Sequence, residues 1–171
     1  MANSRTISKK PLRILGIDPG YERLGIAVVQ KNKNGETLLY SECFKTSPKE
    51  AFTVRLLKLG VRVKEIIKKF NPEALAIENL FVSNNQKTAM RVSEVRGAIL
   101  FVAEESGLSI HEYTPLQVKS AITGYGGSDK RQVEAMTRRL IKIDGAKKLD
   151  DEIDAIAIAL TGSASIRSLR A

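Results

Sequence analysis

The hydrophobic spacing of this chain changes partway along it, and that change most constrains its fold. Up to about residue 45, apolar residues form short runs separated by Pro-Gly and Asn-Gly turns. This pattern predicts three strands, at residues 12–18, 24–30 and 37–44, joined as an antiparallel meander. Two later short apolar runs, at residues 74–77 and 108–113, predict two more strands, each reached through a helical segment.

Helical spacing accounts for most of the remaining chain. Ser47-Pro48-Lys49-Glu50 matches a capping box with proline at the first helical position, which predicts a helix from there to about Asn71. Other helices are expected at residues 86–106, from Thr114-Pro115 onward, at 129–142 and at 151–163. The order βββαβαβ, followed by helices, predicts an α/β fold whose five-stranded mixed sheet has helices on both faces.

The first predicted helix has a basic stripe along one side. We interpret this stripe as a solvated face rather than as a DNA contact. Its residues are Arg55, Lys58, Arg62 and Lys69.

The length of 171 residues suits one domain, which we expect at residues 13–165. Residues 1–12 carry positive charge without an apolar stretch, so we expect a short disordered arm rather than a secretory signal, and residues 166–171 form a tail. No run approaches the roughly 18 apolar residues of a membrane span.

Charge and the scarcity of two residue types narrow the function. The 28 Lys+Arg against 19 Asp+Glu give a net charge of +9, which favours a polyanionic partner such as nucleic acid. The single cysteine, Cys43, excludes an internal disulfide and is consistent with a reducing cytoplasm. The single histidine, His111, has no evident serine or cysteine partner, so catalysis would depend on carboxylates or lysines.

Several acidic residues lie at the ends of, or within, segments that the predicted fold buries. Asp18 and Glu78 each end an apolar strand, and the carboxyl ends of parallel strands meet at one edge of a sheet. Asp154 interrupts a helix that is otherwise apolar nearly all round and has no basic residue within the next turn. Asp151 lies three residues earlier, on the same face, although Asp150 and Asp151 also suit an ordinary helix start. Asp18 and Glu78 are also common turn and strand-end residues.

Four carboxylates in one place repel each other, by something like 4 kcal/mol for a pair at 4 Å with an effective dielectric near 20. A divalent cation removes that repulsion, and oxygen-only ligands favour Mg²⁺ or Mn²⁺ over zinc. Two such ions about 4 Å apart suit in-line displacement at phosphorus. The residues therefore predict a metal-dependent nuclease that uses Asp18, Glu78, Asp151 and Asp154.

Four segments of the chain resemble, in order and spacing, the signature segments of the RuvC family of bacterial Holliday-junction resolvases. The similarity extends from Arg13 to about Ser165. It implies a ribonuclease H-like fold, a homodimer, two Mg²⁺ per subunit and paired symmetric nicks in four-way DNA junctions during recombination and repair. It also implies cooperation with a branch-migration complex. The segments are LGIDPGYERLGIAVV, AIENLFVSNNQKTAMRVSEVRG, QVKSAITGYGGSDKRQV and DDEIDAIAIAL.

The resemblance also implies residue roles. Asp18, Glu78, Asp151 and Asp154 fall on the family's catalytic acids, although Asp150 competes with Asp151 for the third position. Lys119 and Lys130 match basic positions beside the active site, where an ammonium meets a phosphate. Phe81 matches an aromatic residue that stacks on an unpaired base.

Rival interpretations remain at this level. A phosphotransferase of the actin and sugar-kinase group begins similarly, but it needs a second lobe and a second phosphate loop. A non-cutting module for branched DNA would not benefit from four carboxylates, whereas a ribonuclease H-like enzyme acting on RNA stays open. For a homodimer, the candidate surface is the predicted 86–106 helix, where Met90, Leu100 and Phe101 lie outside the main apolar face.

Overall fold

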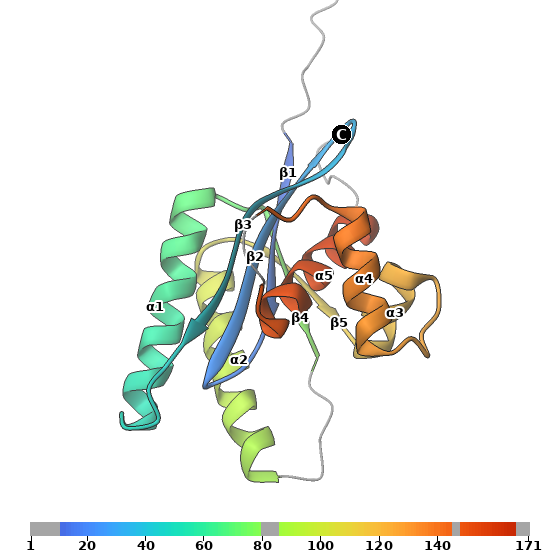
Figure 1. Cartoon of the computed structure of the whole chain (residues 1–171). Coiled ribbons are helices and arrows are strands. Elements are labelled where there is room, and N and C mark those ends of the chain that lie inside the picture. The colour runs from blue at the N-terminus through green and yellow to red at the C-terminus, as the bar shows by residue number, and fades with distance from the viewer. Residues whose placement is uncertain (1–10, 80–85, 145–147, 167–171) are drawn as a thin grey trace, which may run out of the picture.

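Five strands form one mixed sheet in the part of the chain that the computed structural model describes, namely residues 11–79, 86–144 and 148–166 (Figure 1). The order across the sheet is β3-β2-β1-β4-β5, with β1–β2 and β2–β3 antiparallel and β1–β4 and β4–β5 parallel. The predicted meander and mixed sheet are confirmed. The strands are β1 (Leu12–Asp18), β2 (Arg23–Asn32), β3 (Gly35–Lys45), β4 (Ala74–Glu78) and β5 (Ser109–Tyr113).

Helices cover both faces of the sheet, as predicted (Figure 1). On one face, α1 (Phe52–Phe70) and α2 (Gln86–Glu105) pack against side chains such as Leu15 and Ile77. On the other face, α5 (Asp150–Ser165) packs against the alternate strand residues, and α3 (Pro115–Thr123) and α4 (Lys130–Leu140) pack beside it. In the described segments, no helix has the length and hydrophobicity that crossing a bilayer requires.

The predicted start of the first helix is wrong. The backbone oxygen of Ser47 accepts a hydrogen bond from the amide of Glu50 at 3.1 Å, which closes a turn instead of opening a helix. Helix α1 begins only at Phe52, and its N-cap, Ala51, has no side-chain cap bond. The helix starts predicted at Thr114-Pro115 and at residue 129 are confirmed, and the structure shows a complete capping box at each, formed by Thr114 and Asp129.

Arg55 corrects the prediction of a solvated basic face on α1. It is 7% exposed and donates hydrogen bonds to the Tyr21 backbone oxygen at 3.1 Å and to Thr46 Oγ1 at 2.9 Å. Its guanidinium lies 5.1 Å from the centre of the Tyr21 ring, which in turn contacts Phe52 edge-on. Arg91 of α2 lies over the other ring of this pair, 3.9 Å from the Phe52 centroid. These contacts hold the turn that follows β1.

Glycines let α5 lie unusually close to the sheet. A Cβ on Gly16 would meet the Ala155 backbone oxygen at 2.4 Å, and a Cβ on Gly25 would meet the Asp151 backbone oxygen at 2.0 Å. No larger residue fits these two positions without moving the helix backbone. The glycines of β1 and β2 therefore fix the distance between α5 and the strands.

We predict that Gly16→Ala lowers the free energy of unfolding by roughly 1–3 kcal/mol, because the added methyl overpacks the contact between β1 and α5. Urea unfolding followed by circular dichroism measures this change. Gly60→Ala is the matched control, since a Cβ there meets only Val102 Cγ2 at 3.9 Å, and its expected effect is equal or higher stability. Equal stability of Gly16→Ala and wild type would contradict the close packing of α5.

Candidate active site

Two acidic residues end neighbouring parallel strands. Asp18 is the last residue of β1 and Glu78 the last of β4, and their preceding residues, Ile17 and Ile77, are direct partners in the sheet. The apolar residues before each acid are fully buried, so the strand positions are fixed. Both carboxylates thus lie at the same edge of the sheet, as predicted from the sequence.

Helix α5 brings Asp151 and Asp154 to the same edge. The approach at Gly25 holds the Asp151 main chain against β2, and Asp18 Cβ lies close to the same glycine. Asp154 follows one turn later and is half-buried. The negative charges of both helix residues raise the pKa of Asp18, which indicates that they lie near it.

The shared burial of these acids strongly perturbs their protonation. Burial and, after it, the charges of Asp154, Glu78 and Asp151 together raise the pKa of Asp18 to about 7. Burial, followed by the charge of Asp154, also raises the pKa of Glu78. Burial raises the pKa of Asp154 despite the opposing effect of Lys130. This mutual repulsion is the condition that a bound cation relieves.

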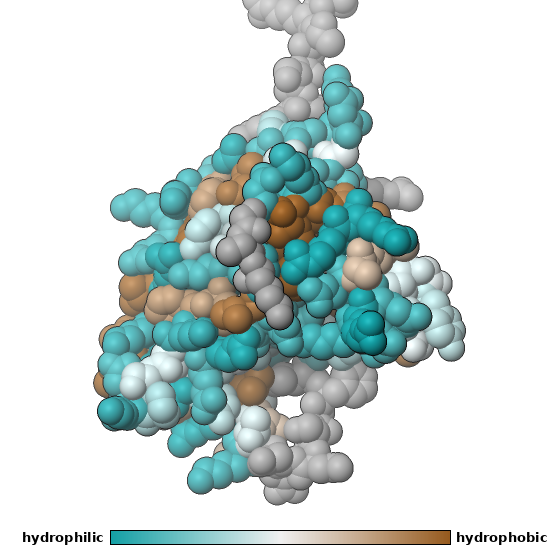
Figure 2. Space-filling model, viewed as in Figure 1, coloured by the Kyte–Doolittle hydropathy of each residue, from teal (hydrophilic) through white to brown (hydrophobic). Residues whose placement is uncertain are grey.

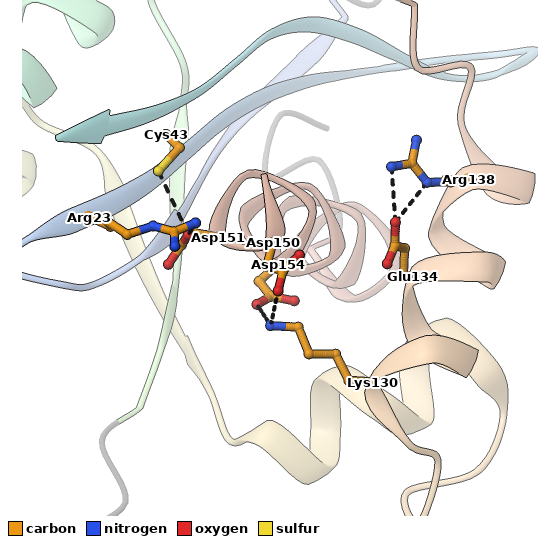
Figure 3. Close-up of polar contacts among 8 residues, drawn as sticks. All are labelled: Arg23, Cys43, Lys130, Glu134, Arg138, Asp150, Asp151 and Asp154. Atoms are coloured by element: carbon orange, nitrogen blue, oxygen red, sulfur yellow. Dashed lines mark hydrogen bonds and ion pairs between the residues drawn. The ribbon is translucent and has the colours of Figure 1, made fainter. Parts of the chain in front are cut away.

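Both predicted lysines lie beside the acids. Lys130, at the start of α4, places its Nζ 3.1 Å from Asp154 Oδ2 and 3.5 Å from Asp150 Oδ2 (Figure 3). Lys119 of α3 is close enough to lower the pKa of Glu78. The partner of Asp154, which the sequence around Asp154 does not contain, thus comes from another helix. Phe81 lies outside the described residues.

Asp151 turns towards a different group of residues. Its carboxylate forms an ion pair with Arg23 and accepts a hydrogen bond from the Cys43 thiol at 3.7 Å (Figure 3). Asp151 and Asp154 lie one helical turn apart, yet their carboxylates bond to different partners. Neither residue was predicted from the sequence to have a role beside Asp151, although Arg23 lies within the segment LGIDPGYERLGIAVV.

The four carboxylates do not form a preformed metal-coordination site in this structure. Within residues 11–79, 86–144 and 148–166, no three His, Cys, Asp or Glu side chains converge closely enough to hold a metal ion. The predicted ligand set is therefore brought to one edge of the sheet but not into coordinating geometry. Two of the four carboxylates are instead paired with cationic side chains, Asp151 with Arg23 and Asp154 with Lys130.

Comparison with known proteins matches the whole described fold. The family model for crossover junction endodeoxyribonuclease RuvC matches residues 14–162. The RuvC of Caldanaerobacter subterraneus subsp. tengcongensis is 41% identical over 149 residues, covering 87% of this chain and 90% of that protein. The structure of Thermus thermophilus RuvC in complex with a Holliday junction substrate is 37% identical and has a TM-score of 0.83, covering 89% of this chain and 93% of that one.

A more distant structure shares only the fold. The yeast mitochondrial Holliday junction resolvase Ydc2 is 16% identical with a TM-score of 0.65, covering 88% of this chain and 78% of that one. Together with the sheet order, these matches define a nuclease with the ribonuclease H-like fold. The chain belongs to the RuvC family of crossover junction endodeoxyribonucleases. Nucleases of this family depend on a metal.

The raised pKa of Asp18 predicts how metal-free stability depends on pH. The unfolded carboxyl ionises near 3.8 and the folded one near 7, so the folded state binds the extra proton in between. Stability from this group is therefore complete below pH 4 and is lost as pH rises through 7. Asp18→Asn should be more stable than wild type at pH 8 in EDTA, and the difference should shrink towards pH 5.

Thermal unfolding of both proteins between pH 5 and pH 8 measures this. Asp144→Asn is the control, because Asp144 is exposed and its neighbour is Lys142 rather than another acid. A variant at Asp18 that was less stable than wild type at pH 8 would show that the carboxylate is not repelled by its neighbours.

Proposed function

We propose that this chain resolves four-way DNA junctions in recombination and repair by hydrolysing one phosphodiester bond in each of two symmetric strands. The observation that carries the proposal is the group of mutually repelling carboxylates at the ends of β1 and β4, beside two lysines. The net charge of +9 and the match to a RuvC bound to a Holliday junction support a DNA substrate.

The proposed cofactor is Mg²⁺, replaceable by Mn²⁺, with two ions per subunit held by Asp18, Glu78, Asp151 and Asp154. The donor set fits, because it contains only carboxylate oxygens and its members raise each other's pKa until a cation is bound. Bound divalent ions supply Lewis acidity, which neutralises phosphate charge and lowers the pKa of the attacking water. Asp151 must leave Arg23 to take part.

Each remaining residue of the site has a proposed role of its own. Lys130 and Lys119 contact the scissile or a neighbouring phosphate, and Lys130 is free to do so once cations replace it beside Asp154. Phe81, outside the described residues, keeps its predicted role of stacking on an unpaired base at the crossover.

Asp151 is a better third ligand than Asp150. The side chain of Asp150 is 70% exposed and its carboxylate is paired with Lys130, whereas that of Asp151 is only 24% exposed. The charge of Asp151 is among the main causes of the raised pKa of Asp18. These differences favour Asp151 at the position where the sequence left the choice open.

A homodimer is proposed to place two identical sites on a junction of near two-fold symmetry. Helix α2 exposes two large apolar side chains, Met90 and Phe101. Leu100 does not belong to this surface, because it is partly buried against the core, contrary to the prediction from the sequence. Cooperation with a branch-migration complex and a cytoplasmic location remain predictions.

A junction-binding module without nuclease activity, or an enzyme that cuts structured RNA, is the alternative. We predict that the protein cuts a labelled four-way junction at paired positions with Mg²⁺, does not cut it in EDTA, and leaves linear duplex and structured RNA intact. Denaturing gels of the products measure this. Binding without cleavage, or cleavage of the RNA, would favour the alternatives.

Asp154→Asn should abolish cleavage, because it removes a proposed ligand, while leaving junction binding intact and metal-free stability equal or higher. Asp150→Asn is the matched control one turn away, and it should still cut. Gel-shift and unfolding measurements on both variants separate loss of chemistry from loss of fold. Near wild-type cutting by Asp154→Asn would reassign this residue to a structural role.

The dimer surface gives a separate prediction. Phe101→Glu should convert the protein to a monomer, since it places a charge on the proposed interface, and light scattering after size exclusion measures the mass. Leu57→Glu is the control: Leu57 is 66% exposed and Phe101 69%, but Leu57 lies on α1, where Val54 and Val61 are also exposed. Figure 2 shows hydrophobic surface on the side of the molecule where Figure 1 draws α1. If Leu57→Glu is monomeric and Phe101→Glu remains a dimer, the interface lies on α1 and not on α2.

A further inference from the structure

The carboxylate of Asp151 is held by two residues that the nuclease chemistry does not require. Arg23 forms an ion pair with it, and the Cys43 thiol donates a hydrogen bond to its Oδ2. Both partners come from the meander, at the start of β2 and near the end of β3. Asp154, by contrast, is bonded to Lys130 from α4 (Figure 3).

The backbone fixes this arrangement. Gly25 pairs with Cys43 in the sheet, and Arg23 pairs with Lys45 two residues away, so both side chains start from rigid strand positions. The approach of Gly25 to the Asp151 backbone oxygen holds the first turn of α5 directly against β2. The packing of α5 on the sheet therefore places Asp151 next to Arg23.

We infer that Arg23 is a positioning residue that holds the Asp151 carboxylate out of the divalent-ion site, so that an ion must displace the guanidinium before Asp151 can coordinate it. This inference rests on the proposed function, because it assumes that Asp151 is a metal ligand. The observation behind it is that the Asp151 carboxylate is paired with Arg23 and accepts a hydrogen bond from the Cys43 thiol, while Asp154 is paired with Lys130.

Arg23 competes with the divalent ion for the Asp151 carboxylate. The stronger the ion pair between Arg23 and Asp151, the more it weakens ion binding. The Arg23 and Asp151 side chains are 45% and 24% exposed, so solvent screens the pair only in part. A partly exposed pair of this type changes an equilibrium by about fivefold at most. Removing the guanidinium should therefore tighten ion binding by up to that factor, while a lysine at the same position should keep most of the competition.

The test measures Mn²⁺ binding to the DNA-free protein by electron paramagnetic resonance, which needs no cleavage. Arg23→Gln should lower the dissociation constant by about fivefold, and Arg23→Lys should stay close to wild type. In an Asp151→Asn background, Arg23→Gln should have no effect, because the competed ligand is gone. Circular dichroism confirms that each variant is folded.

Arg138→Gln is the matched control. It removes the same charge from a comparable ion pair, with Glu134 on α4, on the side of α5 away from Arg23 (Figure 3). It should not change Mn²⁺ affinity. Unchanged or weaker binding in Arg23→Gln, or an effect that persists in Asp151→Asn, overturns the inference. If only the inference is wrong, the wild-type protein still binds Mn²⁺ and cuts junctions. If the proposed function is wrong, the wild-type protein binds no ion at all.

Discussion

Mutual repulsion among carboxylates at one edge of the sheet is the constraint on which the rest of the structure depends. Asp18 and Glu78 end strands whose apolar residues are fully buried, so neither acid can move far without breaking the core. Helix α5 adds Asp151 and Asp154 because glycines let it lie against β1 and β2. Without a divalent ion, this cluster is tolerated only because burial keeps Asp18 readily protonated and because Lys130 and Arg23 pair with the helix acids.

Much of the fold could be predicted from the sequence because local signals and burial agree there. The apolar runs of β1 and β4 and the helix starts at Thr114 and Asp129 depend on short-range patterns, and each is found where it was expected. The start of α1 failed for a physical reason. Ser47 followed by proline fits a tight turn as well as a helix start. The turn forms next to Thr46, whose amide donates to the Glu22 backbone oxygen and whose hydroxyl accepts from Arg55, contacts that no local pattern reveals.

In the candidate site, too, some residues could be predicted from the sequence and others could not. Strand ends are readable from sequence, so the positions of Asp18 and Glu78 could be predicted, and Asp154 was marked by its apolar surroundings. The partners of the helix acids could not be, because Lys130 is 24 residues from Asp154, and Arg23 is still further from Asp151 along the chain. Contacts of that kind depend on how α4 and β2 pack around α5, which no local pattern records.

The buried Arg55 connects the helices on one face of the sheet to the turn that follows β1. It reaches from α1 to the backbone of Tyr21, in the turn that separates Asp18 from Arg23, while Phe52 and Arg91 extend the same contact to α2. The turn after β1 is thus held by α1 and α2, the helices on the face of the sheet opposite α5. Neither helix contains any of the four proposed metal ligands. Helix α2, which exposes Phe101, is therefore joined through Arg91, Phe52 and Tyr21 to the loop between Asp18 and Arg23.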